Sequence, residues 1–323
     1  MSSDVLTSTN TKIEVQANKK YKRELTMRKL KRDKWLYVLL IPGVLYYLIF
    51  KIAPMWGIII AFQDYSPFLG VSGSEWIGFK NFTDFFQNPD FIRLFANTLV
   101  LSLLSIVFYF PAPILISLML NEIRRDLYKK VIQTFVYIPH FVSMVVVVSI
   151  SYILFTTEGG PINNLIVNLG ASKINFLGSI AWFRPLIIIQ TIWKECGWGT
   201  IIFLAALSSV DAEQYEAAIV DGAGRFRQLW HITLPAIRST IVILLIMRMG
   251  SVLSNGFEHI FLMTNSLNRS VADVFDTYVY TLGVTQGAFS YSTAVGLFKS
   301  LIGLILILST DKIAKKCGES GLF

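Results

Sequence analysis

The residues of this chain that could do chemistry are polar side chains inside strongly apolar stretches. Lys194 and Glu195 are neighbours in one such stretch, Trp-Lys-Glu-Cys-Gly-Trp, and Arg248 lies in the next. Ionisable groups are costly at membrane depth and usually mark an ion or substrate path. Aromatic rings suit the apolar faces of sugars, while charged and amide groups bind hydroxyls and carboxylates. We therefore expect a water-filled substrate path. Its candidate residues are Trp193, Lys194, Glu195, Trp198, Arg248, Asn255 and Glu258.

The same side chains have a second interpretation, in which they only hold helices together. An internal ion pair, such as Lys194 with Glu258, would do this without touching a substrate. The three histidines, His140, His231 and His259, lie in different segments and have no partner at metal-ligand spacing. We expect each of them to be a hydrogen-bonding residue, and we expect no metal site.

Enzymatic functions are disfavoured by the motifs that are missing. The sequence has no G-x-x-x-x-G-K-[ST] loop to hold nucleotide phosphates, no G-x-S-x-G elbow and no H-E-x-x-H pair. We therefore expect no catalytic residue and no cofactor in this chain. The chain by itself cannot hold ATP in the way that the phosphate loop does.

The composition is that of a membrane protein, because 54% of the 323 residues are hydrophobic and only 15% are charged. About 20 apolar residues cross the hydrocarbon core as a helix. Six stretches qualify, so we predict an all-α, polytopic protein with six transmembrane helices. The predicted spans are 35–53, 99–120, 131–155, 185–210, 239–262 and 293–309.

The basic residues predict the orientation of these spans. Lys and Arg crowd the N-terminal tail, the 121–130 connection, the 211–238 loop and the C-terminus, and they are sparse in the alternate connections. The positive-inside rule then places both termini and the 211–238 loop in the cytoplasm. A basic tail could also bind nucleic acid, but directly before a spanning helix it is better explained by anionic headgroups. We expect a multi-pass membrane protein and no nucleic-acid partner.

A polar, basic insertion between two apolar runs is the most specific feature of the sequence. It reads EAAIVDGAGRFRQLWHITLP over 216–235. Asp211 can cap a helix there, with Gln214 as its capping-box partner. Gly222 and Gly224 can adopt the left-handed conformation that ends a helix. We predict a short helix, a bend and a second short segment that docks onto a partner.

These residues resemble the cytoplasmic signature of type I ABC importer permeases. That signature is Glu-Ala-Ala, three residues, Gly, nine residues and Ile-x-Leu-Pro, and the spacing here has no departure from it. The likeness covers roughly 98–316. The longer form with Asp-Gly-Ala-Gly, the added first helix and the long tail are similar to the carbohydrate subgroup.

The resemblance implies a coupling element that inserts into a cleft of a cytoplasmic ATPase. Glu216 would pair with basic groups of that subunit. The residues carried over are Glu216, Ala217, Ala218, Asp221, Gly222, Gly224, Ile232, Leu234 and Pro235. It further implies a membrane complex with a second, related permease, two ATPases that hold ATP and Mg, and an extracytoplasmic solute-binding protein.

The resemblance also implies that the substrate is an oligosaccharide. An acidic one, such as alginate, would give Lys194 and Arg248 a role. An ion-coupled secondary transporter that works without an ATPase is the alternative.

The predicted organisation follows from these points. A cytoplasmic basic tail covers 1–34, and the first span with an extracytoplasmic loop covers 35–97. A permease core of five spans covers 98–310 and contains the coupling loop 211–237. A cytoplasmic tail covers 311–323. Outer segments near 63–97, 159–164 and 265–291 are rich in aromatic and polar residues that could meet a substrate-delivery protein.

Overall fold

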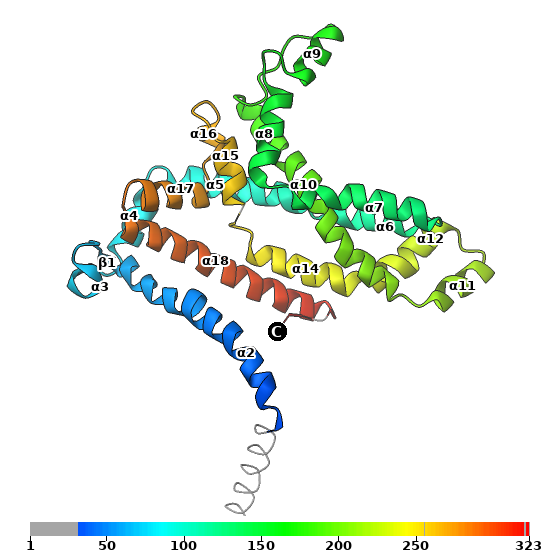
Figure 1. Cartoon of the computed structure of the whole chain (residues 1–323), viewed down its shortest axis with the longest axis horizontal. Helices are drawn as coiled ribbons and strands as arrows, with labels where there is room; N and C mark the ends of the chain where they lie inside the picture. Colours follow the sequence, from blue (N-terminus) through cyan, green and yellow to red (C-terminus); the bar gives the residue numbers. More distant parts are fainter. Residues whose placement is uncertain (1–31, 255, 320, 323) are drawn as a thin grey trace, which may run out of the picture. The chain divides into compact units, whose positions relative to one another are not determined.

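The computed structural model describes residues 32–254, 256–319 and 321–322, and it is almost entirely helical there (Figure 1). The strands described are the two-residue pair β1 (Gln63–Asp64) and β2 (Glu75–Trp76), which run antiparallel. The all-α class is therefore confirmed. The chain forms two compact units, 1–59 and 60–323. Most of the predicted basic tail, 1–31, lies outside the described residues, as does Asn255.

The described part of the first unit is an apolar helical run. α2 (Lys34–Tyr47) continues as the π-helical η1 (Leu48–Ile52) and the 3₁₀-helical η2 (Ala53–Phe62), whose last residues belong to the second unit. An 18-residue window of the run 34–62 has a mean hydropathy of 2.0, and a helix that is apolar all round suits lipid. It extends nine residues beyond the predicted end at Ala53.

Two further unbroken helical runs are long and apolar enough to cross a membrane. One is α5 (Phe91–Leu104), the π-helical η3 (Ser105–Tyr109) and α6 (Pro111–Asn121), and the other is α18 (Phe289–Lys316). The π turn ends at Tyr109, just before Phe110 and Pro111, and the nitrogen of Pro111 has no hydrogen to donate to the preceding turn. Both runs contain the predicted spans 99–120 and 293–309.

The predicted third span is not one helix. α7 (Asp126–Phe141) and α8 (Met144–Phe155) are bent by 100° relative to each other. Pro139 disturbs the end of α7, and Ser143 then caps α8 by accepting a hydrogen bond from Val146 N. A proline followed by a capping residue is therefore the physical reason why 131–155 breaks.

The predicted fifth span, 239–262, is also wrong as a single helix. α14 (Arg238–Gly250) ends at a glycine, and α15 (Phe257–Met263) starts after Gly256, which has φ of 76°. Only glycine adopts that conformation readily, so the chain turns there. At its other end α14 meets the 225–236 segment at a bend of 57°.

The fourth predicted span corresponds to α10 (Ile180–Ser208), which packs mainly against α6 and α7. A Cβ at Gly197 would clash with the carbonyl of Val136, so this glycine permits the close approach of α10 to α7. By length and composition the described helices supply three spans, or five if each bent pair is one. α10, with Arg184, Lys194 and Glu195 in it, would be the sixth.

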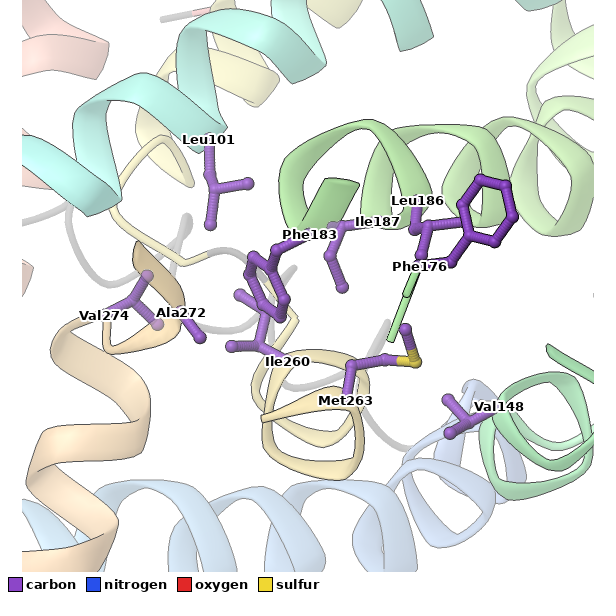
Figure 2. Close-up of a cluster of buried hydrophobic side chains, with 10 residues drawn as sticks. All are labelled: Leu101, Val148, Phe176, Phe183, Leu186, Ile187, Ile260, Met263, Ala272 and Val274. Carbon is purple, nitrogen blue, oxygen red and sulfur yellow. The ribbon is translucent and has the colours of Figure 1, made fainter. Parts of the chain in front are cut away.

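A hydrophobic core joins α5, α8, α10 and α15 (Figure 2). Phe183 and Ile187 of α10 lie in it with Leu101 of α5, Val148 of α8 and Ile260 of α15, all less than a tenth exposed. This core fixes the positions of the helices that surround the polar residues predicted from the sequence.

The outer segments fold into short helices of the second unit, 60–323. They are α3 (Gly70–Gly73), α4 (Lys80–Gln87), α9 (Pro161–Asn168), α16 (Arg269–Ala272), α17 (Phe275–Tyr280) and the π-helical η5 (Thr281–Thr285). Phe85 of α4, Leu94 of α5, Phe275 of α17 and Val295 of α18 form one buried cluster. The predicted aromatic outer segment is thus only partly packed, because Phe85 is buried whereas Phe68, Trp76 and Phe79 are exposed.

Candidate functional site

The predicted docking element is built from α11 (Ala212–Val220) and α12 (Arg225–Gln228). Oδ1 of Asp211 accepts a hydrogen bond from Glu213 N at 3.0 Å, as a capping residue should. Among the described residues, the reciprocal bond expected from Gln214 is not found. The predicted order of short helix, bend and second helical segment is present.

A Schellman motif makes the bend. Gly222 N donates to Ile219 O at 3.0 Å, and Ala223 N donates to Ala218 O at 2.8 Å. This pattern needs a left-handed residue at its centre, and Gly222 supplies it with φ of 75°. Gly224 does not share that role, because its φ is −66° and it starts α12. The sequence pattern could not separate the two glycines.

The second half of the element is anchored to the helices beneath it. α12 runs into the π-helical η4 (Leu229–Thr233) and α13 (Leu234–Ala236). Leu234 packs with Phe203 and Ile237 in a buried cluster, and Tyr215 OH lies 3.0 Å from Thr233 Oγ1. Ile232 is half-buried, whereas Pro235 is exposed. The element is thereby tied to α10 and α14.

The surface of the element that faces away from α10 and α14 is exposed to solvent. Glu216, Ala217, Asp221, Gly222 and Gly224 are exposed and Ala218 is half-buried. Val220 and Phe226 expose 87% and 81% of their surface. A groove of about 390 Å³ runs beside them, lined by Leu115, Leu118, Met119, Glu122, Arg225, Phe226 and Leu229. An exposed apolar patch with polar residues around it is typical of a surface that binds another protein.

Some of the polar residues of the spans line a separate cavity of about 280 Å³. Of the seven predicted path residues, Glu195 and Arg248 line it. The other lining residues used below are Ser105, Tyr109 and His259, and the apolar floor includes Leu101, Ile187 and Ile260, which Figure 2 shows. The cavity lies where α14 ends and α15 begins, so the broken fifth span helps to form it.

Glu195 is held by two neighbours. His140 Nδ1 donates to its Oε2 at 2.9 Å, and Lys194 Nζ lies 3.3 Å from its Oε1. Lys194 also donates to the carbonyl of His140 at 2.8 Å, and its side chain is 10% exposed. The negative charge of Glu195 is therefore balanced within the protein, and Lys194 does not line the cavity.

Arg248 has different surroundings. Its Nη2 donates to Ser105 Oγ at 2.5 Å, and its Cζ lies 5.6 Å from the ring centre of Tyr109. Both contacts come from the π turn of the second span, where Ser105 and Tyr109 share a face. Among the described residues, no ion pair is found for Arg248.

The remaining path residues lie elsewhere. Trp193 and Trp198 are exposed on α10, and Trp198 stacks on His140 at 5.0 Å between ring centres. The alternative pairing of Lys194 with Glu258 is wrong, because Lys194 pairs with Glu195 and Glu258 is exposed. Asn255 lies outside the described residues.

Sequence reasoning missed several residues of the cavity. Ser105 and Tyr109 are common residue types in an apolar run, and only the proline after them hinted at a distorted turn. All three histidines are hydrogen-bonded as predicted: His140 to Glu195, His231 to Arg227 O and His259 to Gln190. In the part of the chain that the structure describes, no group of three metal-ligating side chains occurs.

Comparison with known proteins gives the chain its family. The model of the binding-protein-dependent transport system inner membrane component matches residues 109–318. Protein LplB of Bacillus subtilis (strain 168) is 65% identical over 92% of this chain and 93% of its own. The polygalacturonan/rhamnogalacturonan transport system permease protein YteP of the same strain is 57% identical over 94% and 95%.

Solved structures agree with this family. The chain is similar to one from a bacterial alginate ABC transporter in complex with an alginate-bound periplasmic protein, with a TM-score of 0.84 at 39% identity over 91% of this chain and 99% of that one. A second, from a transporter that imports the acidic polysaccharide alginate, has a TM-score of 0.83 at 40% identity over 90% and 98%. These relatives speak against an ion-coupled transporter. The chain is a multi-pass membrane protein and belongs to the binding-protein-dependent transport system inner membrane components.

Proposed function

We propose that this chain is the permease subunit of an ATP-driven importer of oligosaccharides. The observation that carries the proposal is the exposed helix–turn–helix element of 211–237, in which a Schellman turn presents Glu216 and apolar side chains at a surface. Residues at such a surface fit a protein cleft better than a substrate. The names of the relatives, one a polygalacturonan/rhamnogalacturonan transport permease and one from an importer of the acidic polysaccharide alginate, support an oligosaccharide as the cargo.

In the proposed complex, two cytoplasmic ATPases hold ATP and Mg, and this chain has no catalytic part. Glu216 pairs with basic groups of one ATPase, and Ala217, Ala218, Asp221, Gly222 and Gly224 allow close approach. Movement of the ATPases during ATP hydrolysis is transmitted to α10 and α14 through Leu234, which packs with Phe203 and Ile237. Ile232 and Pro235 complete that anchor. The inner-membrane family and the basic residues support a bacterial plasma membrane with both termini in the cytoplasm.

A second, related permease and an extracytoplasmic solute-binding protein complete the proposed assembly. The bound periplasmic protein in the similar alginate transporter supports the latter. The domain limits expected from the sequence, 1–34, 35–97, 98–310 and 311–323, are part of this proposal.

The test uses the complete complex in proteoliposomes. Uptake of galacturonate and alginate oligosaccharides presented by the binding protein is measured with ATP, with a non-hydrolysable ATP analogue, and with Na⁺ or H⁺ gradients alone. We expect uptake only with hydrolysable ATP, and ATPase stimulation by at least one saccharide. Uptake driven by an ion gradient would contradict the ATP-driven mechanism, and no stimulation by any saccharide would contradict the substrate class.

A further inference from the structure

We infer that Arg248, Ser105 and Tyr109 form an anion subsite that selects the carboxylate of an acidic sugar as it passes through the membrane. This inference rests on the proposed function and adds the chemical basis of its selectivity. The evidence for it is that Glu195 and Arg248, which line the cavity of about 280 Å³, differ in their interaction partners.

The two charged groups of opposite sign at the cavity are not partners of each other. Glu195 has Lys194 at 3.3 Å and His140 at 2.9 Å, so its charge is already balanced. Arg248 has only a hydroxyl and an aromatic ring as partners among the described residues. The described lining therefore carries an uncompensated positive charge at Arg248. A buried or half-buried charge favours an opposite charge from a ligand when the protein supplies none.

The geometry holds the guanidinium ready for a carboxylate. One of its five N–H donors is used by Ser105 Oγ, and the ring of Tyr109 lies against it, so the side chain has a fixed place while other donors remain. A guanidinium binds a carboxylate through two parallel hydrogen bonds, which an ammonium cannot do. Lys194, which the sequence also suggested for this role, is occupied by Glu195 and the His140 carbonyl.

The size of the cavity limits what it can hold. Sites for small molecules are usually about 300–1,000 Å³, and this one lies just below that range. It fits one charged unit of a chain better than a whole oligosaccharide. Its apolar floor of Leu101, Ile187 and Ile260 can contact the sugar ring while Arg248 takes the carboxylate.

The experiment measures charge selectivity in the complete transporter. Proteoliposomes take up a galacturonate trisaccharide or its neutral methyl ester, each loaded on the same binding protein, and the ratio of kcat/KM values is determined. Comparing that ratio between variants cancels any preference of the binding protein. We expect wild type to prefer the acid and Arg248→Gln to reduce the ratio about tenfold or more, the loss typical of a charge-assisted hydrogen bond. Arg248→Lys should recover part of it.

Arg184→Gln is the matched control. Arg184 is also a half-buried arginine hydrogen-bonded to a neutral side chain, Asn97 Oδ1 at 2.9 Å, but it does not line the cavity. Its replacement should leave the ratio unchanged. An unchanged ratio in Arg248→Gln would overturn the subsite alone, as would equal loss of both substrates in Arg248→Gln and Arg248→Lys. Failure of the wild-type complex to take up either trisaccharide would overturn the proposed function and the subsite together.

Discussion

Lys194 and Glu195 are adjacent in α10, yet their charged groups lie 3.3 Å apart and the lysine side chain is 10% exposed. Consecutive residues of a helix normally point in different directions. Here the carbonyl of His140, which accepts from Lys194, and the ring of His140, which donates to Glu195, bring the two together. The three residues therefore form one network that joins α7 to α10.

Breaking this network on one side should destabilise the protein. Glu195→Ala leaves the Lys194 charge buried without a carboxylate, and we expect a loss of roughly 1–3 kcal/mol in the free energy of unfolding, less than for a fully buried pair because Glu195 is partly exposed. The double variant Lys194→Met with Glu195→Leu should lose less than the sum of the single changes. Denaturant unfolding of the purified chain in detergent measures both. Additive losses would show that the pair is not coupled.

The two glycines of the docking element should respond differently to alanine. Gly222 has φ of 75°, so Gly222→Ala costs about 1–2 kcal/mol although nothing lies near the new methyl group. Gly224 has an ordinary φ and equally open surroundings, so Gly224→Ala is its matched control. We expect faster hydrogen exchange at Ala223 N, which bonds to Ala218 O, only in Gly222→Ala. Equal exchange rates in the two variants would contradict this assignment.

Asn97 should be important for stability rather than for transport. Its amide donates to Ser270 O at 2.9 Å and Asp273 O at 3.0 Å, and its oxygen accepts from Arg184. Asn97→Ala leaves these groups unpaired near the outer end of the second span, and we expect a loss of about 1–3 kcal/mol. Asn97→Asp keeps the acceptor and should still be destabilised by the lost donors. Unfolding midpoints like that of wild type in both variants would show that water replaces the bonds.

The buried cluster of Phe85, Leu94, Phe275 and Val295, against which Tyr278 packs, should lose stability at alkaline pH. Burial, and next the hydrogen bond with Tyr291, raise the pKa of the Tyr278 phenol above its ordinary value of about 10. Because the folded chain holds this proton more tightly than the unfolded chain, the stabilisation is complete below pH about 10 and is lost as the pH rises further. Thermal unfolding midpoints measured from pH 8 to 11 should fall less steeply for Tyr278→Phe. Parallel curves for the two proteins would rule out Tyr278 as the cause.

The helical class, the membrane setting and the helix–bend–helix form of 211–228 could be predicted from the sequence, because each depends on local residue pattern. Apolar length predicts a span, and the glycine at 222 predicts a helix end. The breaks at 142–143 and 251–256 were missed because the apolar pattern continues across them. Pro139 and the glycines at 250 and 256 interrupt the helices without making the sequence polar.

The cavity was only half predictable from the sequence for a related reason. Charged residues stand out in an apolar run, so Glu195 and Arg248 were found. Their partners were not, since Ser105 and Tyr109 reach Arg248 only through a π turn, and Lys194 turns toward Glu195 because of the carbonyl of His140. Such contacts depend on how helices pack, which spacing along one chain does not encode.

The central claim is that 211–237 binds an ATPase and couples ATP hydrolysis to transport. A charge reversal at Glu216 tests this claim most directly. Glu216 is exposed, so Glu216→Lys should leave the fold of the isolated chain unchanged. Glu158→Lys is the control: Glu158 is 80% exposed, pairs with the exposed Lys173, and gives the same change in net charge. Co-purification of the ATPase and ATP-driven uptake are measured for both. The account predicts that Glu216→Lys reduces each at least tenfold while Glu158→Lys retains ATPase binding. Normal ATPase binding and uptake by Glu216→Lys would contradict it.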